Sequence, residues 1–387
     1  MLTRIFKSTD SLKMKVLILG NPCSVWVKEF IQNVMLPLEA EVFLQESFDR
    51  RTNYYDYYNE AGVKIIPFAP VNKWIMILPK VRAIIIAQHQ RKSCSRHAPF
   101  DVVINMFVSP ELLSQAASYK QEGSKVYAYF CGSDIIRSSK INSLRLKLGL
   151  KHCSGVICAS SNVHEAYLYK IGYTINTPVE TIRLGMSSFD FINAQLFRGD
   201  KSDYKTSWNI DPKKLTICIG YNASEAQNHL AVLRQLQYLS KSTLGKITVL
   251  LQMTYGGNEE YIANVESAVS GLGCDFKLFR SYLNMPQIAQ LRLLTDVFIN
   301  AQVTDGLSGS VLEALYAGSI LLNASWLHYK EYNEWGISYK TFLGFEQIPQ
   351  LLAEAMDDTS KNDINREILK SQMTWQQCRD AWARLLK

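Results

Sequence analysis

The 387-residue chain is long enough for two domains of ordinary size. Its 47% apolar and 20% charged residues are typical of a globular protein and exclude a disordered or low-complexity chain. The net charge of +7 is spread widely, without a Lys/Arg block, zinc-finger spacing or RNA-binding aromatic motif, so no nucleic-acid partner is predicted. An anionic membrane surface or a phosphorylated substrate suits this charge better.

The eight cysteines are scattered without CxxC pairs, so neither a disulfide framework nor a zinc site is predicted. The first 15 residues contain no apolar run that would serve as a signal peptide or a membrane span. The folded core is therefore expected from about residue 14, in a protein located in the cytoplasm.

Short apolar strands alternate with helical stretches along the whole chain. The first half predicts strands at residues 16–19, 41–43, 64–66, 102–105, 126–129 and 155–159. The pattern restarts after residue 214, with strands at 216–219, 248–252, 276–279, 297–300 and 320–322. Buried strands that alternate with helices indicate parallel, doubly wound α/β sheets, and the restart indicates two of them.

The first strand is followed by Gly20-Asn21-Pro22-Cys23-Ser24, which lacks the GxGxxG spacing of a Rossmann cofactor site. Asn21 is a candidate for ligand contact, and the alternative is an ordinary turn with Ser24 as N-cap. The fifth strand is followed by Gly132-Ser133-Asp134. Ser133 and Asp134 are candidates for acceptor contact, and Asp134 would be a general base if the reaction inverts; the alternative is that Asp134 caps the next helix.

Residues 73–92, KWIMILPKVRAIIIAQHQRK, mix aliphatic side chains with five Lys/Arg. Lys80 and Arg82 lie at the centre, which excludes a bilayer span. Two interpretations stay open: a core helix kinked at Pro79, or a basic, apolar surface that docks on a membrane.

In the second half, Gly220 to Leu230 follows the first strand and reads GYNASEAQNHL, with no Lys or Arg before Arg234. Asn222 is a candidate hydrogen-bond donor to phosphate. The strand that ends at Phe279 is followed by Arg280-Ser281-Tyr282, whose arginine and tyrosine are candidate site residues.

The segment from Thr295 to Trp326 carries the strongest signal. A strand is followed by Asp305, then by Leu307-Ser308-Gly309-Ser310 at the opening of a helix, then by Glu313. Unpaired amides and the helix dipole favour an anion such as a diphosphate, and Gly309 permits its close approach. Asp305 and Glu313 are placed to accept hydrogen bonds from sugar hydroxyls. The alternative is a surface loop with Ser308 as N-cap and Glu313 as a solvated residue.

This segment resembles the nucleotide-sugar signature of retaining GT-B glycosyltransferases: an acidic residue, seven residues, and a glutamate followed by alanine. The resemblance implies that Asp305 lies at the donor sugar and Glu313 at the ribose. It also makes Arg280 a candidate phosphate partner and Tyr282 a candidate to pack on the nucleobase. The first acid is usually glutamate, so Asp305 reaches one methylene less far. Gly132-Ser133-Asp134 resembles an element of family-four members of the fold, which often have histidine where this chain has Cys131.

The loop from Gly220 to Leu230 departs from that family, whose members often carry an arginine and a lysine there as a diphosphate clamp. It resembles instead the transferases of 4-acetamido-4,6-dideoxygalactose (Fuc4NAc) that act on undecaprenyl-linked saccharides and use a TDP-sugar. Residues 249–262, VLLQMTYGGNEEYI, agree with that resemblance. Their sugar is not implied for this chain.

The resemblance implies a GT-B fold, with two Rossmann-like doubly wound parallel-sheet domains that face a central cleft. Residues 1–190 would form the acceptor domain, closed by a C-terminal helix at about 374–387, and residues 191–373 the donor domain. The expected function is transfer of a hexosyl or deoxyhexosyl group from a nucleoside-diphosphate sugar to a saccharide acceptor, lipid-linked, in bacterial surface polysaccharide synthesis. No cofactor and no metal are expected in the chemical step.

Several questions stay open at this point. Peripheral contact with the cytoplasmic face of the inner membrane is an alternative to a purely cytoplasmic protein. A nucleotide-sugar 2-epimerase shares the fold but needs acid and base groups that the six histidines do not obviously supply. A non-catalytic partner subunit is the other rival, because the clamp is missing and Asp305 replaces glutamate. Retention or inversion is undecided.

Overall fold

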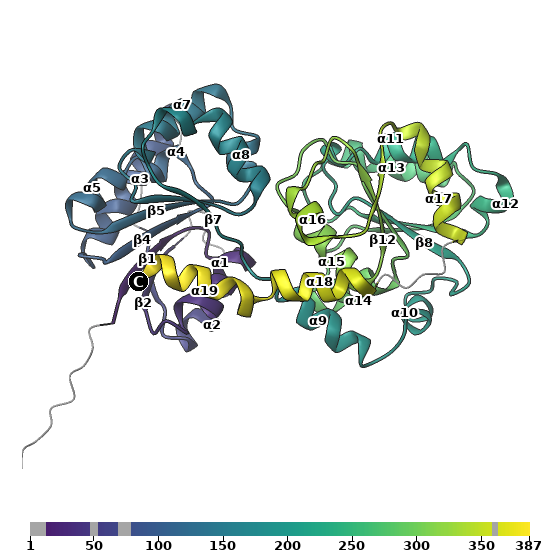
Figure 1. Cartoon of the computed structure of the whole chain (residues 1–387), viewed down its shortest axis with the longest axis horizontal. Coiled ribbons are helices and arrows are strands. Elements are labelled where there is room, and N and C mark those ends of the chain that lie inside the picture. Colours follow the sequence, from purple (N-terminus) through teal and green to yellow (C-terminus); the bar gives the residue numbers. More distant parts are fainter. Residues whose placement is uncertain (1–12, 47–52, 69–78, 358–362) are drawn as a thin grey trace, which may run out of the picture. The chain divides into compact units, whose positions relative to one another are not determined.

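The computed structural model describes residues 13–46, 53–68, 79–357 and 363–387. Its contacts divide the chain into two compact units, each described by itself (Figure 1). The first unit takes the described residues up to Ala159, Val163–Ile182 and Arg379–Lys387. The second takes Ser160–Asn162 and Arg183–Cys378.

The first unit is built on a seven-stranded, wholly parallel sheet with the order β3-β2-β1-β4-β5-β6-β7. Its central strands are continuous apolar runs buried on both faces, as parallel sheets require. The strands are β1 (Lys15–Leu19), β2 (Glu41–Gln45), β3 (Lys64–Ile66), β4 (Val102–Met106), β5 (Lys125–Phe130), β6 (Gly155–Cys158) and β7 (Val179–Thr181).

Helices cover both faces of this sheet (Figure 1). Two of them begin at serines whose side chains accept a bond from the backbone, Ser109 from Leu112 N and Ser139 from Asn142 N. The helical segments are α1 (Val25–Phe30), the π-helix η1 (Ile31–Met35), α2 (Tyr55–Glu60), α3 (Pro79–Ser95), α4 (Pro110–Leu113), α5 (Ala116–Gln121), α6 (Ser133–Ile136), α7 (Lys140–Leu150), α8 (Ser161–Lys170) and the 3-10 turn η3 (Gly172–Thr174).

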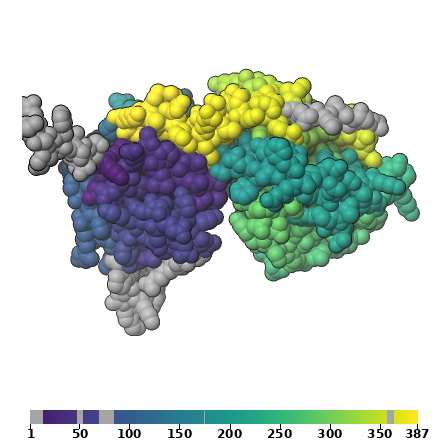
Figure 2. All heavy atoms as spheres, turned by 90° about the horizontal axis from the view of Figure 1, so that it is seen from below, coloured from purple at the N-terminus to yellow at the C-terminus, as the bar shows by residue number. Residues whose placement is uncertain are grey.

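The last helix, α19 (Trp375–Leu386), contributes its final residues to the first unit. Trp382 is fully buried, with ring centroids 4.7 Å from Phe30 and 5.2 Å from Tyr129, and Arg379 Nε donates to Asn33 O at 2.7 Å. Figure 2 shows the yellow C-terminal atoms over the purple atoms of the N-terminal residues. The last helix thus contributes buried side chains to the core that the N-terminal segments form.

The second unit repeats the architecture with a six-stranded parallel sheet in the order β10-β9-β8-β11-β12-β13. The predicted doubly wound parallel sheets are therefore confirmed for both units. The strands are β8 (Leu215–Ile219), β9 (Ile247–Gln252), β10 (Asp275–Phe279), β11 (Val297–Asn300), β12 (Ile320–Ala324) and β13 (Lys340–Phe342).

The helical segments of the second unit follow the same alternation along the chain (Figure 1). They are α9 (Ser188–Leu196), α10 (Lys201–Ser207), η4 (Glu225–Gln227), α11 (His229–Leu236), α12 (Lys241–Leu244), α13 (Glu259–Ser270), α14 (Met285–Leu294), α15 (Gly309–Ala317), α16 (Lys330–Trp335), η5 (Phe345–Gln347), α17 (Ile348–Asp357) and α18 (Asp363–Met373).

Two strands were not predicted from sequence, β7 and β13. Each has three residues and lies at the edge of its sheet, and their sequences VET and KTF lack the apolar run of a central strand. Pairing with a single neighbour makes them strands, which no local pattern indicates.

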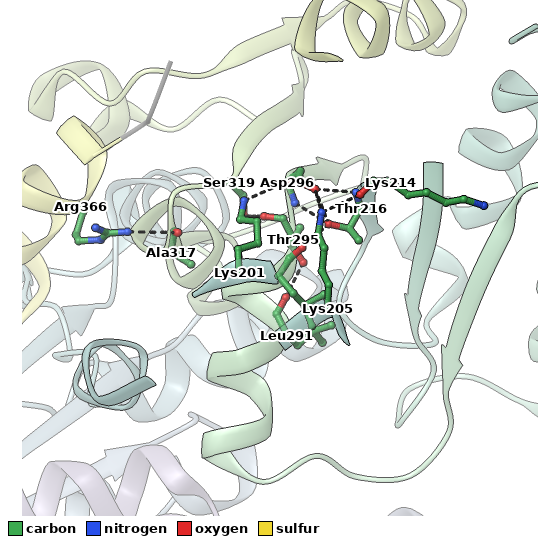
Figure 3. Close-up of polar contacts among 11 residues, drawn as sticks. Lys201, Lys205, Lys214, Thr216, Leu291, Thr295, Asp296, Ala317, Ser319 and Arg366 are labelled. Carbon is green, nitrogen blue, oxygen red and sulfur yellow. Dashed lines mark hydrogen bonds and ion pairs between the residues drawn. The ribbon is translucent and has the colours of Figure 1, made fainter. Parts of the chain in front are cut away.

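A polar cluster holds together the amino ends of the strands of the second sheet (Figure 3). Asp296, just before β11, accepts from Lys201 Nζ and Lys205 Nζ at 2.7 Å each and from Thr216 N at 2.8 Å. Arg366 Nε, on α18, donates to Tyr316 O at 2.8 Å, at the carboxyl end of α15. These contacts lie at the opposite sheet edge from the loops described below, so their role is structural.

None of the described helices has the length and apolar character needed to cross a bilayer. The basic, apolar segment predicted at 73–92 is only partly described. Residues 73–78 lie outside the described residues, and α3 begins at Pro79.

Candidate functional site

The second sheet reverses its strand order between β8 and β11, which are hydrogen-bonded neighbours. Doubly wound sheets bind ligands beyond the carboxyl ends of the strands at such a point. The loops that leave these two strands contact each other: Tyr221 Oη donates to Gln302 Oε1 at 3.1 Å, and Asn228 Nδ2 donates to Ala301 O at 2.7 Å. The chain therefore forms one surface from two distant segments here.

Two glycines permit this close packing. Gly220 has φ +62°, and a Cβ there would lie 2.8 Å from Gln227 Oε1 and 2.9 Å from His229 Nε2. A Cβ on Gly257, in the loop after β9, would lie 2.3 Å from the carbonyl oxygen of Ala223. A larger residue at Gly220 would clash within the segment that follows β8, and one at Gly257 would push the loop after β9 away from that segment.

Asp305 is held at the start of α15 by two donors. Its Oδ2 accepts from Ser308 N at 2.9 Å and from Tyr329 Oη at 2.5 Å. Ser308 occupies the N-cap position, but its side chain makes no cap hydrogen bond. The carboxylate of Asp305 caps the helix instead, where the alternative drawn from the sequence had assigned this role to the side chain of Ser308. Gly309 and Ser310 follow as the partly exposed first residues of the helix, after the half-buried Leu307.

Tyr329 is fully buried and belongs to a polar chain beneath Asp305. Asn300 Nδ2, at the end of β11, donates to Tyr329 Oη at 3.0 Å and to Asn323 Oδ1 at 2.9 Å. Burial raises the pKa of Tyr329 well above its ordinary value, and the charge of Asp305 raises it further. Tyr329 therefore stays protonated and donates to the carboxylate.

Glu313 forms an ion pair with a buried arginine. Arg292 Nε, on α14, donates to Glu313 Oε2 at 3.1 Å, and Arg292 Nη1 donates to Gln252 Oε1 at 2.8 Å. The side chains of Arg292 and Glu313 are 1% and 12% exposed. The alternative in which Glu313 is a solvated helix residue is therefore wrong, because the fold pairs it with Arg292.

Two tyrosines lie near the two acids, Tyr221 near Asp305 and Tyr255 near Glu313. Burial raises the pKa of Tyr221 to about 12; the charge of Asp305 adds to the shift, and hydrogen bonding with Ser308 and Gln227 opposes it. For Tyr255 burial again raises the pKa most, hydrogen bonding with Asn222 opposes the rise, and Tyr282 adds to it. Both predicted residues of the neighbouring loops, Asn222 and the 83% exposed Tyr282, thus lie around Tyr255.

The loop after β8 presents neutral polar atoms. Burial lowers the pKa of His229 to about 4, so the ring is neutral at physiological pH, and its Nδ1 lies 3.2 Å from Tyr261 Oη. Among the described residues, His229 Nε2, Gln227 Oε1 and Gln302 Nε2 are buried without a hydrogen-bond partner. Such atoms are costly to bury and mark a place where a polar ligand or water belongs.

Arg280 lies at the surface, 44% exposed, and is engaged by two acids of α13. Its Nη1 donates to Glu259 Oε2 and its Nη2 to Glu266 Oε2, both at 2.8 Å. These two carboxylates raise its pKa. The charge of Arg280 is thus already balanced, and its role as a phosphate partner stays a prediction.

The first-unit candidates follow β1 and β5. Asn21 is exposed, and its Oδ1 accepts from Cys23 N at 3.0 Å. Ser133 is exposed at the start of α6. Asp134 accepts from Cys131 N at 3.0 Å, from Gly132 N at 2.8 Å and from Val108 N at 3.1 Å.

Asp134 thereby joins the loop after β5 to the loop after β4. Burial raises its pKa, and the backbone amides oppose the rise. In this position Asp134 organises the two loops. Its role as a general base stays a prediction.

No three His, Cys, Asp or Glu side chains gather as a metal site in the part of the chain that the structure describes. The expectation of metal-independent chemistry rests on the sequence and stays a prediction.

Sequence reasoning missed Arg292, Gln252, Tyr329, Asn300 and Asn323. Three of these five share a signal that was available: a buried apolar strand that ends, or nearly ends, in an amide side chain, as Gln252, Asn300 and Asn323 do. Such residues meet at the ligand edge of a parallel sheet. Arg292 and Tyr329 lie in unremarkable local sequence, and only packing reveals them.

No protein-family model and no curated protein matches the chain. Among solved structures, a glycosyltransferase from Rickettsia africae superposes with a TM-score of 0.76 at 12% identity, over 97% of this chain and 98% of its own. Anabaena HepE in complex with UDP and glucose gives 0.70 at 14%, over 96% and 99%. The α,α-trehalose 6-phosphate synthase of Burkholderia multivorans gives 0.71 at 9%, over 97% and 98%.

The fold is GT-B. At these identities the likeness establishes the GT-B architecture alone. Asp305, Ser308 and Glu313 lie on the second sheet of that architecture, beyond its switch point.

Proposed function

We propose that this GT-B chain is a glycosyltransferase that binds a nucleoside-diphosphate sugar on its second unit and transfers the sugar to a saccharide. The observation that carries the proposal is the arrangement at the β8/β11 switch point. There the amide end of α15, the oriented carboxylate of Asp305 and the paired carboxylate of Glu313 lie within one helix start.

Each group has a task that its contacts support. The amides of Gly309 and Ser310 and the helix dipole favour a diphosphate, whereas Ser308 N already donates to Asp305. Glu313, a turn further on and held by Arg292, is oriented to accept from ribose hydroxyls. In this proposal Asp305, whose Oδ2 accepts from Ser308 N and Tyr329 Oη, contacts the donor sugar.

Transfer breaks the bond between the anomeric carbon and the diphosphate oxygen, and the diphosphate leaves with the electron pair. A new bond forms from that carbon to an acceptor hydroxyl oxygen, whose proton is lost. Helix amides stabilise the charge that develops on the leaving diphosphate without reorganisation. For an inverting transfer, the candidate base that receives the acceptor proton is Asp134.

The donor nucleotide to test first is UDP, because Anabaena HepE, a protein of similar structure, forms a complex with UDP and glucose. TDP follows, because the loop from Gly220 to Leu230 resembles the Fuc4NAc transferases. The same resemblance supports a lipid-linked saccharide acceptor, a place in surface polysaccharide synthesis and peripheral contact with the inner membrane.

A non-catalytic GT-B partner subunit is the second candidate. It is favoured by the loop after β8, which offers neutral Gln227 and His229 where many transferases carry cations, and by the prior engagement of Arg280 with two acids. Such a subunit would keep the fold without binding a nucleotide.

Calorimetric titration and thermal unfolding with UDP, GDP, dTDP, ADP and CMP separate the two. A nucleotide at 100 times its dissociation constant stabilises the chain by about 2.7 kcal/mol. Glu313→Gln keeps an oxygen that accepts from Arg292 but removes the charge that strengthens bonds to the ribose. We expect the affinity to fall about tenfold to a hundredfold, the equivalent of about 1.5–3 kcal/mol.

Glu354→Gln, the same change on the exposed surface of α17, is the matched control and should bind like wild type. A response to one nucleoside diphosphate that Glu313→Gln weakens supports the transferase. If no nucleotide binds to wild type, the transferase is refuted and the non-catalytic subunit is favoured.

A further inference from the structure

Helix α7 of the first unit exposes three large aliphatic side chains on one face. Ile141, Leu144 and Leu148 are 73%, 63% and 61% exposed, whereas Leu146 and Leu150 are buried in the core. Figure 1 shows α7 on the outer side of its unit. Single exposed leucines are common on protein surfaces, but three neighbours on one helix face indicate a surface that contacts something.

Lysines border this apolar face. Counted from Lys140, residues four, seven, eight and eleven positions on share its side of an α-helix, and these are Leu144, Lys147, Leu148 and Lys151. The helix contains no acidic residue. Its remaining cation, Arg145, pairs with Glu111 at 2.8 Å, so the lysines set the charge of the exposed face.

A groove runs beside the carboxyl-terminal half of α7. Its volume is about 570 Å³, and its lining combines the apolar and basic residues of the face with the turn before β7: Leu144, Lys147, Leu148, Lys151, Ile175, Asn176 and Thr177. The surface is therefore hollowed where the leucines and lysines meet.

Two further exposed aromatic side chains lie at the end of α8. Tyr169 and Tyr173 are 88% and 87% exposed, at the end of α8 and just after it. Between them, Lys170 Nζ donates to the carbonyl oxygens of Ile135 and Ser138, which immediately precede α7. The end of α8 is thus held beside the segment that precedes α7, and exposed tyrosines are favoured where an apolar layer meets water.

We propose that the α7 face, defined as Lys140, Ile141, Leu144, Lys147, Leu148 and Lys151, docks on the surface of an anionic phospholipid bilayer. The aliphatic side chains enter the boundary between headgroups and acyl chains, and the lysines meet anionic headgroups. This inference rests on the proposed function and deepens it, because a lipid-linked saccharide acceptor lies at the surface of such a bilayer.

Charge selects the bilayer over a second copy of the chain. In a two-fold contact the α7 face would meet itself and place lysines against lysines. An anionic bilayer instead complements the three lysines and accepts the aliphatic side chains. The residues of this face are other than residues 73–92, the segment that the sequence suggested for membrane contact.

Flotation of the full chain with vesicles tests the proposal. We expect binding to phosphatidylcholine vesicles that contain phosphatidylglycerol to exceed binding to pure phosphatidylcholine on the order of a hundredfold, from about a fivefold gain for each of three lysines. The preference should weaken at high salt, because exposed charges are screened.

The variants separate the two components of the face. The triple change Lys140→Gln, Lys147→Gln, Lys151→Gln should remove the preference for the anionic lipid. The double change Leu144→Ser, Leu148→Ser should lower binding to both kinds of vesicle. Leu343→Ser, at a 75% exposed leucine of the second unit, is the control and should bind like wild type.

Wild-type binding that is equal with and without phosphatidylglycerol, or unchanged in the lysine variant, overturns the proposal. So does a dimer in solution that the leucine variant dissociates while vesicles go unbound. Nucleotide titration of the same variants distinguishes this failure from a failure of the transferase. Vesicle binding without any nucleotide binding refutes the transferase and leaves the docking face standing.

Discussion

At the residue scale, the two acids of the candidate site are held in different ways. Asp305 accepts from a backbone amide and from the hydroxyl of a buried tyrosine, which are both neutral donors. Glu313 is neutralised by Arg292, which is buried and also bonded to Gln252. A buried arginine without a carboxylate partner is strongly unfavourable. Glu313 therefore contributes to the stability of the fold in addition to any contact that it makes with a ligand.

His229 gives a pH-dependent prediction at the same scale. Its pKa falls from 6.5 to about 4 on burial, so the unfolded chain binds a proton in a pH range where the folded chain does not. The stability that results is fully present above pH 6.5 and is lost as the pH falls toward 4. Wild type should therefore lose about 2 kcal/mol of unfolding free energy between pH 7 and pH 5 through this residue.

Urea denaturation at the two pH values checks the effect in wild type and in His229→Gln. The variant should lack this part of the loss. His164→Gln changes a half-buried histidine of the first unit and is the control. An equal loss in wild type and His229→Gln would contradict a neutral buried ring.

At the scale of elements, polar side chains gather at both ends of the strands of the second sheet, where they serve different purposes. At the carboxyl edge, Gln252, Asn300 and Asn323 end or nearly end their strands and position the acids of the site. At the amino edge, Asp296 joins β8, β11 and α10 through Thr216, Lys201 and Lys205 (Figure 3). Burial alone would raise the pKa of Asp296, but the two lysines outweigh it and the pKa is lowered.

Removal of Asp296 should therefore destabilise the second unit. Lys205 is only 5% exposed and would lose its carboxylate, so Asp296→Ala should cost about 3 kcal/mol or more in unfolding free energy. The control is Asp275→Ala on the same sheet, whose partner Lys214 lies at 2.7 Å in an exposed pair and should contribute less than about 1 kcal/mol. Urea denaturation measures both, and equal costs would contradict a structural role for the cluster.

At the scale of the whole molecule, each unit has its own sheet and its own buried core. A donor bound at the β8/β11 loops should therefore stabilise the second unit selectively. Hydrogen exchange should show slower exchange in peptides from β8, β9 and β11 on addition of the nucleotide that binds, by up to about 2.7 kcal/mol at 100 times its dissociation constant. Peptides from β4 and β5 serve as the internal control. Equal protection in both sheets would contradict a donor site confined to the second unit.

Local sequence patterns were enough to predict the two doubly wound sheets and the helix start at which the candidate site is proposed. Apolar strands alternating with helices are such a pattern, and parallel order with loops at one edge follows from it. The two doubly wound sheets were predicted in this way, and the helix start at Gly309 was expected from the residues around it. The short edge strands β7 and β13 were not, because their pairing and not their composition makes them strands.

Which charged residues form pairs, and which face of a helix is buried, depends by contrast on tertiary packing. Arg292 meets Glu313, and Tyr329 meets Asp305, because strands and loops far apart in sequence are packed at one sheet edge. The neutrality of His229 follows from burial, which the sequence does not display. In α7 the residues Leu144, Leu146, Leu148 and Leu150 look alike in sequence, and only the position of the sheet decides that two are buried and two face outward. Contacts between distant residues carry this information, and a local pattern does not contain it.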